Sequence, residues 1–198
     1  MLKKLFQSFR SPLRRAAHKR STPEVLNSNQ HPLRRGEISR YALSVVDRLQ
    51  QAGYQAYLVG GCVRDLLLNL EPKDFDVATS ATPEQVRAEF RNARVIGRRF
   101  KLVHVHFGRE IIEVATFRAN HPQGDEDEDS NLSSRNESGR ILRDNVYGSL
   151  EDDAQRRDFT INALYLDASC ERILDYANGV HDIRNRLIRL IGDPEKRY

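Results

Sequence analysis

The sequence has few cysteines, no long apolar run and neither of two common phosphate-loop motifs. Its two cysteines, Cys62 and Cys170, lie far apart without a CxxC pair, which argues against a disulfide framework or zinc site and favours a reducing, cytoplasmic compartment. No stretch approaches the ~18 consecutive apolar residues that a membrane helix requires, so we expect no membrane span. Neither GxGxxG nor GxxxxGK[ST] occurs, which excludes Rossmann and P-loop nucleotide sites at the sequence level.

Positive charge is concentrated near the N-terminus. Residues 1–36 contain nine Lys or Arg and one acid, whereas residues 37–198 contain 23 basic and 27 acidic residues. Such a segment can hold nucleic acid or an anionic membrane surface, and it also resembles an organelle transit peptide. A solvated tail is the simplest interpretation. We therefore predict a disordered basic arm over 1–36 and a folded domain over 37–192.

The remaining chain alternates between helical and strand patterns. Apolar spacing and capping residues predict helices over 38–52, 62–70 and 83–90, after Ser149, and over 179–187. Content of β-branched and aromatic residues predicts strands over 54–60, 75–79, 94–108, 109–117, 163–167, 171–176 and 188–192. Residues 119–140 are acidic and aperiodic, which predicts a mobile insertion loop. This order predicts an α/β (α+β) domain with mixed strand directions.

Two aspartates separated by one residue, Asp74 and Asp76, begin an apolar strand pattern. Side chains at i and i+2 of a strand share a face, so the two carboxylates should point together while Phe75 joins the core. A divalent cation would relieve their repulsion, and Mg²⁺ prefers hard oxygen ligands. The alternatives are two exposed acids on an edge strand, or Asp74 capping a turn after Pro72.

A glycine pair, Gly60 and Gly61, stands where a predicted strand meets a predicted helix. Without a Cβ the backbone N–H groups can approach a ligand, and the start of a helix favours phosphate. Arg64 lies in the first helical turn and would add a charged fork to phosphate oxygens. The alternative is a tight turn with no ligand. Together with the aspartates, however, the pair predicts a site for a metal-bound triphosphate.

Charged residues in two other segments extend this hypothesis. In "DAQRRDFTINAL", Arg156 and Arg157 precede Asp158, and they either form a structural ion pair or bind triphosphate. Glu113 interrupts an apolar strand pattern, where an unpaired charge would be costly. We expect it to pair with an arginine, such as Arg118 or Arg157, or to bind metal.

The segments "LVGGCVRDLLL", "KDFDVAT" and "RRDFTINAL" resemble the head of class II nucleotidyltransferases, the polymerase-β-like family of CCA-adding enzymes and bacterial poly(A) polymerases. "IGRRFKLVHVHFGREIIEVATFR" and "LRDNVYGSLEDDAQRRDFTINALY" look closer to its bacterial poly(A) polymerases. The resemblance covers residues 37–198. It implies a mixed, mostly antiparallel sheet flanked by helices, with the start of a helical neck at 193–198.

The resemblance also implies roles for individual residues. Asp74 and Asp76 would hold two Mg²⁺ ions, with Asp158 as third catalytic carboxylate and Glu113 as its rival. Triphosphate binding would fall to Gly60, Gly61, Arg64, Arg156 and Arg157. Less specific roles in guiding RNA or triphosphate would fall to Arg98, Arg99 and Lys101.

The implied activity is transfer of AMP from ATP to RNA 3′ ends, with RNA-decay proteins as possible partners. The alternatives are a CCA-adding enzyme, which shares the head motifs, and an RNA-binding protein that has lost catalysis. Family members select the base with helices beyond the head. We therefore expect this chain to be a truncated form of a longer polymerase, with weak nucleotide binding and poor RNA extension on its own.

Overall fold

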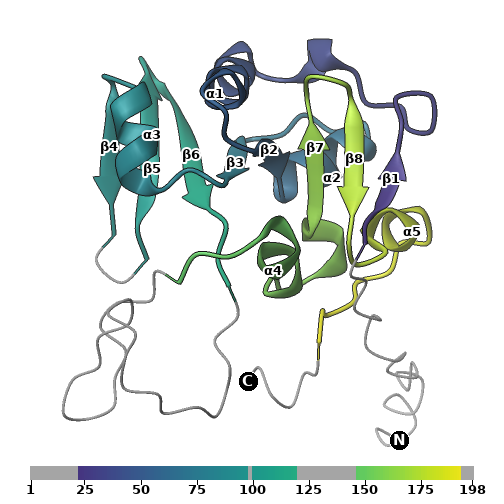
Figure 1. The fold of residues 1–198 in the computed structure, drawn as a ribbon. Coiled ribbons are helices and arrows are strands. Elements are labelled where there is room, and N and C mark those ends of the chain that lie inside the picture. The colour runs from purple at the N-terminus through teal and green to yellow at the C-terminus, as the bar shows by residue number, and fades with distance from the viewer. Residues whose placement is uncertain (1–21, 98–99, 120–145, 193–198) are drawn as a thin grey trace, which may run out of the picture.

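The computed structural model of the protein describes residues 22–97, 100–119 and 146–192. Their centre is an eight-stranded sheet with the order β1-β8-β7-β2-β3-β6-β5-β4, which Figure 1 shows edge to edge. The strands are β1 (Glu24–Leu26), β2 (Ala56–Val59), β3 (Asp76–Thr79), β4 (Ala93–Ile96), β5 (Leu102–Phe107), β6 (Glu110–Thr116), β7 (Leu164–Asp167) and β8 (Arg172–Asp175). All neighbouring strands are antiparallel except β3 and β6, which run parallel.

Five α-helices and two short 3₁₀ turns flank this sheet. They are η1 (Arg35–Glu37), α1 (Arg40–Gln51), α2 (Gly61–Leu67), α3 (Pro83–Glu89), α4 (Leu150–Gln155), η2 (Thr160–Asn162) and α5 (Gly179–Arg184). The predicted fold class is therefore confirmed. No helix among the described residues is long and apolar enough to cross a bilayer. Residues 120–140 of the insertion loop expected over 119–140 lie outside the described residues. The expected start of a neck at 193–198 lies outside them as well.

Helix α1 shows how the sequence sets local structure. The Ser39 hydroxyl caps its N-terminus by accepting hydrogen bonds from the backbone N–H groups of Tyr41 and Ala42. Its apolar stripe, Ala42, Val45, Val46 and Leu49, is fully buried. The helix thus covers the sheet with one face and leaves its polar face in solvent.

The two faces of the sheet are covered by different hydrophobic clusters. One face carries the main core, where α1 and α3 pack over residues such as Val105 and Ile112. The other face carries a smaller cluster in which Leu150 and Ala154 of α4 pack against Val59, Ala78 and Tyr165. Side chains alternate along each strand, so Asp76 points to the same face as Ala78 and to the side of α4. The smaller cluster therefore borders the predicted site.

The predicted arm over 1–36 is wrong for its C-terminal part. Residues 24–26 form β1, which pairs antiparallel with β8, and Leu33 is completely buried. Arg35 donates to the Ala168 carbonyl oxygen and forms an ion pair with Asp47. The two apolar residues of this short strand, Val25 and Leu26, gave too weak a pattern to predict it. Residues 1–21 of the predicted arm lie outside the described residues.

Two predicted strands also differ from the structure. The strand expected over 94–108 is divided into β4 and β5, and Gly97 between them has a φ of +83°, which does not fit a continuous strand. The strand expected over 188–192 forms only an isolated bridge between Leu190 and Phe159. Ile188 is 78% exposed, and Ile191 is buried in a small separate cluster with Ala163 and Ala177.

Candidate active site

The glycine pair forms the corner between β2 and α2. Gly60 has φ +80° and ψ −133°, a conformation essentially restricted to glycine, and it stands at the N-cap of α2. A Cβ built on Gly60 would lie 3.5 Å from Arg157 Nη1, and one on Gly61 would lie 3.5 Å from Arg64 Nη2. Two of the three arginines predicted to bind phosphate, Arg157 and Arg64, therefore reach the corner, one at each glycine.

Arg157 is held by a buried acid and a buried phenol. Its Nη2 and Nε donate to Asp153 Oδ2 at 3.1 Å and 3.3 Å, and its Nε also lies 3.0 Å from the Tyr165 hydroxyl. That hydroxyl in turn donates to Asp153 Oδ2 at 2.7 Å. Burial alone would lower the pKa of Arg157, but Tyr165 and Asp153 raise it overall. The guanidinium is therefore charged and fixed in direction.

The carboxylates face these arginines from β3 and β6. Asp76 and Glu113 are direct partners in the parallel register of the two strands, so their side chains share a face. The pKa of Asp76 is raised to about 6 by burial first and then by Glu113 and Asp74, while Arg157 lowers it. Asp76 is exposed at the start of β3, so solvent screens part of these interactions. Three acids and one guanidinium thus meet in one electrostatic neighbourhood.

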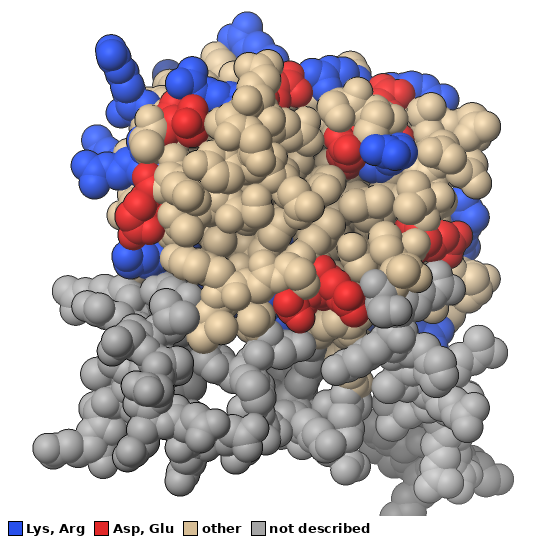
Figure 2. Space-filling model, viewed as in Figure 1, with Lys and Arg blue, Asp and Glu red and all other residues tan. Residues whose placement is uncertain are grey.

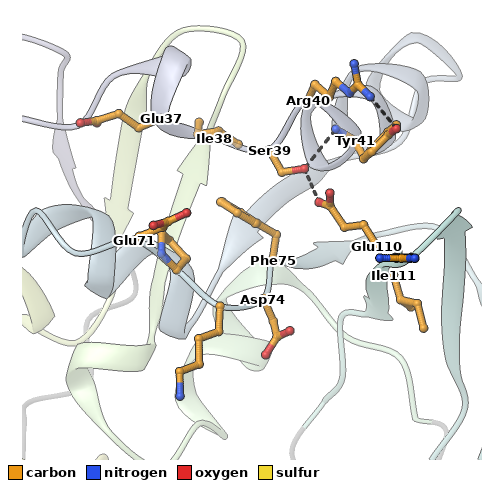
Figure 3. A pocket seen from close by; sticks show the side chains of 13 residues that line it. Glu37, Ile38, Ser39, Arg40, Tyr41, Glu71, Asp74, Phe75, Glu110 and Ile111 are labelled. Atoms are coloured by element: carbon orange, nitrogen blue, oxygen red, sulfur yellow. Dashed lines mark hydrogen bonds between the residues drawn. The ribbon is translucent and has the colours of Figure 1, made fainter.

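Asp74 and Phe75 precede β3, which begins at Asp76, and their side chains point to different sides. Phe75 packs against the main core, and Figure 3 shows the Asp74 carboxylate pointing away from the ring. Asp74 also lines a hollow of about 810 Å³ between the start of α1, the segment 71–75 and the β5–β6 turn. Asp76, Glu113 and both arginines lie outside that lining, so we place the chemistry at the diglycine corner and not in the hollow.

The donor chemistry of this site fits Mg²⁺. Asp74, Asp76 and Glu113 supply hard oxygen atoms, and the pKa of Asp76 is raised first by burial and then by repulsion from Glu113 and Asp74, which a divalent cation would relieve. No group of three His, Cys, Asp or Glu side chains among the described residues is already converged on one point. Mg²⁺ characteristically binds through one or two carboxylates together with substrate phosphates. The arrangement therefore fits a metal that arrives with a nucleotide better than a preformed cage.

The other residues predicted for the site lie on several different elements. Asp158 is exposed, and its backbone carbonyl accepts a hydrogen bond from the Ile191 N–H. Arg156 is half-buried at the C-cap of α4. Lys101 forms an ion pair with Glu84 of α3 at 2.7 Å. Arg98 and Arg99 lie outside the described residues. The structure therefore places Arg64 and Arg157 at the glycine pair and couples Asp76 electrostatically to Glu113, Arg157 and Asp74, and the roles of all the predicted site residues stay predictions.

Glu113 has a different neighbour from the one expected. His104 of β5 lies directly across from it in the sheet, and His104 Nε2 is 3.3 Å from Glu113 Oε2. Arg157, one of the two arginines expected to pair with Glu113, pairs with Asp153 instead. The apolar pattern around Glu113 was misleading because only one face of β6 is buried.

Sequence reasoning missed several residues that build this site. Asp153 lies in α4 and Arg157 follows four residues later, just past the end of the helix, and this spacing would have indicated the pair. Tyr165, His104 and Asn162 gave no such signal, because their contacts depend on strand register and on the path of the chain after α4. Cys62 lies beside the corner, but burial raises the pKa of its thiol to about 11, so it stays protonated at neutral pH.

We expect the two glycines to respond differently to alanine. Gly60→Ala forces a Cβ into a positive φ and should cost about 1–3 kcal/mol of folding stability. Gly61→Ala places alanine at a helical position with only ordinary contacts and should leave stability unchanged or raise it by up to ~1 kcal/mol. Urea denaturation of both variants measures the difference. Equal stability losses would contradict the assigned backbone geometry.

A pH dependence follows from the raised pKa of Asp76. Its folded-state value of about 6 exceeds the ordinary 3.8, so the ionised carboxylate disfavours folding above pH 6, and this effect disappears as pH falls towards 4. Asp76→Asn should therefore raise the metal-free melting temperature at pH 8 by roughly 2 °C, a modest value because solvent screens an exposed group. At pH 4 we expect no change. Thermal unfolding followed by circular dichroism tests this, with Glu71→Gln as control, and an equal shift at both pH values would contradict it.

Comparison with known proteins places this arrangement among nucleotidyltransferases. Residues 56–189 match the family model described as "Poly A polymerase head domain". The chain is 57% identical over 174 residues to "Poly(A) polymerase I" of Salmonella typhimurium, covering 88% of this chain and 37% of that protein. It is 41% identical over 157 residues to the "CCA-adding enzyme" of Lactobacillus helveticus, covering 79% of this chain and 36% of that protein.

A solved structure gives the same result. The CCA-adding enzyme of Bacillus stearothermophilus in complex with CTP aligns with a TM-score of 0.61 and 39% sequence identity, covering 79% of this chain and 34% of that one. The chain thus spans a little over a third of the length of these relatives, between 34% and 37%.

Proposed function

The chain belongs to the poly(A) polymerase head domain family, and from that premise we propose that it acts in template-independent transfer of AMP from ATP to RNA 3′ ends. The proposal depends most on one observation: Arg64 and Arg157 lie at the side-chain-free glycine corner, and the charge of Arg157 acts on Asp76 together with those of Glu113 and Asp74. Identity of 57% to a poly(A) polymerase, against 41% to a CCA-adding enzyme, favours AMP as the transferred group.

In the proposed reaction, the RNA 3′-oxygen forms a bond to the α-phosphorus of ATP, and the bond from that phosphorus to the β-phosphate oxygen breaks. Pyrophosphate leaves and the hydroxyl proton is lost to solvent or a carboxylate. Bound Mg²⁺ would lower the pKa of the 3′-hydroxyl and compensate the charge of the leaving group. Asp74 and Asp76 would hold the metal. Catalysis then consists of positioning and charge compensation.

The arginines would bind the phosphates that become pyrophosphate. Guanidinium forks match phosphate oxygens in pairs, and Arg64 and Arg157 end beside the two glycines whose backbone is open to a ligand. Arg156, at the end of α4, is proposed as an additional contact. Because Arg157 is held by Asp153 and Tyr165, it need not reorganise when triphosphate binds.

For the third carboxylate we propose Glu113 ahead of Asp158. Glu113 is the register partner of Asp76 and the largest charge acting on its pKa, whereas Asp158 is exposed beyond α4. His104, 3.3 Å from Glu113, would orient that carboxylate.

Binding of RNA by the described head is proposed to be weak. Figure 2 shows one face of the molecule, on which Lys and Arg lie near the margin and the centre carries little charge. Contacts of Lys and Arg with phosphate dominate the affinity of proteins for nucleic acid. This face therefore contributes little affinity for RNA. Other partners, such as RNA-decay proteins, remain part of the proposal. The two free thiols, one buried and one exposed, support a reducing compartment and a cytoplasmic location.

The proposal is tested by incubating the chain with a radiolabelled oligoribonucleotide, Mg²⁺ and each NTP separately. We expect the RNA to be extended by a few nucleotides with ATP, to be extended little with CTP, GTP or UTP, and not to be extended without Mg²⁺. Addition of CMP and AMP to a tRNA that lacks its CCA end, with no extension of generic RNA, would support the CCA-adding alternative instead. Metal-independent RNA binding with no extension by any NTP would support the non-catalytic alternative.

A further inference from the structure

The residues after Asp158, Thr160 to Asn162, form η2, a turn that the reaction described above does not use. Asn162 is its last residue and it contacts both phosphate-binding arginines. Arg64 Nη1 donates to Asn162 Oδ1 at 2.8 Å, and Arg157 Nη1 lies 3.5 Å from the Asn162 carbonyl oxygen. One residue thus joins two side chains that come from different parts of the chain.

The turn is rigidly mounted. Thr160 is fully buried, its hydroxyl donates to Asp182 Oδ2 at 2.7 Å, and Asp182 is itself fully buried in α5. A Cβ on Gly179, the first residue of α5, would lie 2.2 Å from the Thr160 carbonyl oxygen, so the helix and the turn are in direct backbone contact. Asn162 therefore has a fixed position relative to α5 and to the sheet.

The contacts of Arg64 leave part of its guanidinium for a ligand. Its Nε and Nη2 both approach Asp65 Oδ1 at 2.8 Å, and Nη1 donates to Asn162. Of the five N–H groups of the guanidinium, these contacts occupy three, so among described residues one N–H on each terminal nitrogen has no acceptor. Asp65 holds one edge of the plane and Asn162 holds the other. Without Asn162 the plane could rotate about the Asp65 contact.

We propose that Asn162 is a positioning residue that sets the directions of Arg64 and Arg157 over the glycine pair, and that it thereby makes the site selective for the triphosphate over nucleotides with fewer phosphates. This inference rests on the proposed function of the corner as a triphosphate site. Asn162 acts through the arginines: its amide oxygen orients Arg64 and its backbone carbonyl orients Arg157. Substitution of its side chain therefore removes the contact with Arg64 and keeps the backbone contact with Arg157.

The test compares binding of ATP, AMP and inorganic tripolyphosphate, with Mg²⁺, to the full chain by isothermal titration calorimetry. For Asn162→Ala we expect ATP and tripolyphosphate to bind on the order of 10-fold more weakly, the factor that corresponds to about 1.4 kcal/mol. AMP binding should change less than about twofold, since its single phosphate lies next to the carboxylates and not at the arginines. Asn162→Ser should behave in the same way and serves if the alanine variant does not fold.

A double-mutant cycle with Arg64→Lys separates positioning from general support of the fold. Lysine keeps the charge but cannot contact Asp65 and Asn162 together, so Asn162→Ala should add little to the loss that Arg64→Lys already causes. Asn185→Ala, which removes a side-chain hydrogen bond to a backbone carbonyl in α5 away from the corner, is the matched control and should leave all three affinities unchanged.

The possible results are distinct. Unchanged ATP binding in both Asn162 variants, an equal loss for AMP, or full additivity with Arg64→Lys would overturn the inference while leaving the proposed function intact. A wild-type chain that binds tripolyphosphate no better than orthophosphate would instead overturn the assignment of the corner as a triphosphate site.

Discussion

Asp76→Ala is expected to reduce AMP transfer by at least ~10³-fold, which corresponds to about 4 kcal/mol of lost transition-state stabilisation. The charges of Glu113, Asp74 and Arg157 all act on Asp76, which couples it to each of these proposed site residues. Its loss would remove a metal ligand that no neighbouring side chain replaces, because Glu113 is on another strand and Asp74 precedes β3. Single-turnover AMP transfer to an oligoribonucleotide measures the effect.

The fold should survive this substitution. Asp76 is exposed, and in the absence of metal its charge is repelled by its neighbours, so circular dichroism should remain that of the wild type. Glu71→Gln is the matched control, because it removes an acid that lines the hollow beside Asp74 but has no place in the proposed site. Activity of Asp76→Ala within a few-fold of the control would show that the assignment of the site is wrong.

Glu113→Gln and Asp158→Asn are expected to separate the two candidates for the third carboxylate. Glu113→Gln keeps the shape and the strand register but removes the charge next to Asp76, and we expect a loss on the order of 10²-fold in AMP transfer. Asp158→Asn keeps the backbone hydrogen bond from Ile191 and neutralises an exposed carboxylate, and we expect a loss below about 5-fold.

The same two variants also report on the metal. Since Glu113 belongs to the carboxylate group, the Mg²⁺ concentration needed for half-maximal activity should rise for Glu113→Gln and stay unchanged for Asp158→Asn. The reverse pattern, with Asp158→Asn inactive and dependent on high Mg²⁺, would return the third catalytic role to Asp158 and reduce Glu113 to a sheet residue paired with His104.

Local patterns in the sequence predicted most of the fold. The stripe of Ala42, Val45, Val46 and Leu49 gave α1, and Thr82 followed by Pro83 gave the start of α3 with its capping box. These signals work because the interactions lie within one or two helical turns. Strand β1 was missed because it is three residues long and is ordered only by pairing with β8, about 150 residues later in the chain.

The candidate site was predicted in part for a similar reason. Gly60, Gly61, Arg64, Asp74 and Asp76 lie within 17 residues of one another, and their types and spacing carry the chemistry. The contact of Glu113 with His104 depends on the register of the β5–β6 hairpin, and that of Arg64 with Asn162 arises only when residues 98 positions apart are brought together. Residue types alone suggested an arginine partner for Glu113, because they do not reveal which neighbour the register supplies.

The central claim is that two neighbouring acids beside the glycine corner capture a metal-bound nucleotide. A crystal structure of the chain with Mn²⁺ and an ATP analogue that has a non-hydrolysable α–β bridge tests it most directly, because Mn²⁺ is located by its anomalous scattering. We expect manganese bound by Asp74 and Asp76, with the triphosphate over Gly60 and Gly61 and in contact with Arg64. Nucleotide bound away from this corner, or manganese without a ligand from Asp76, would contradict the account.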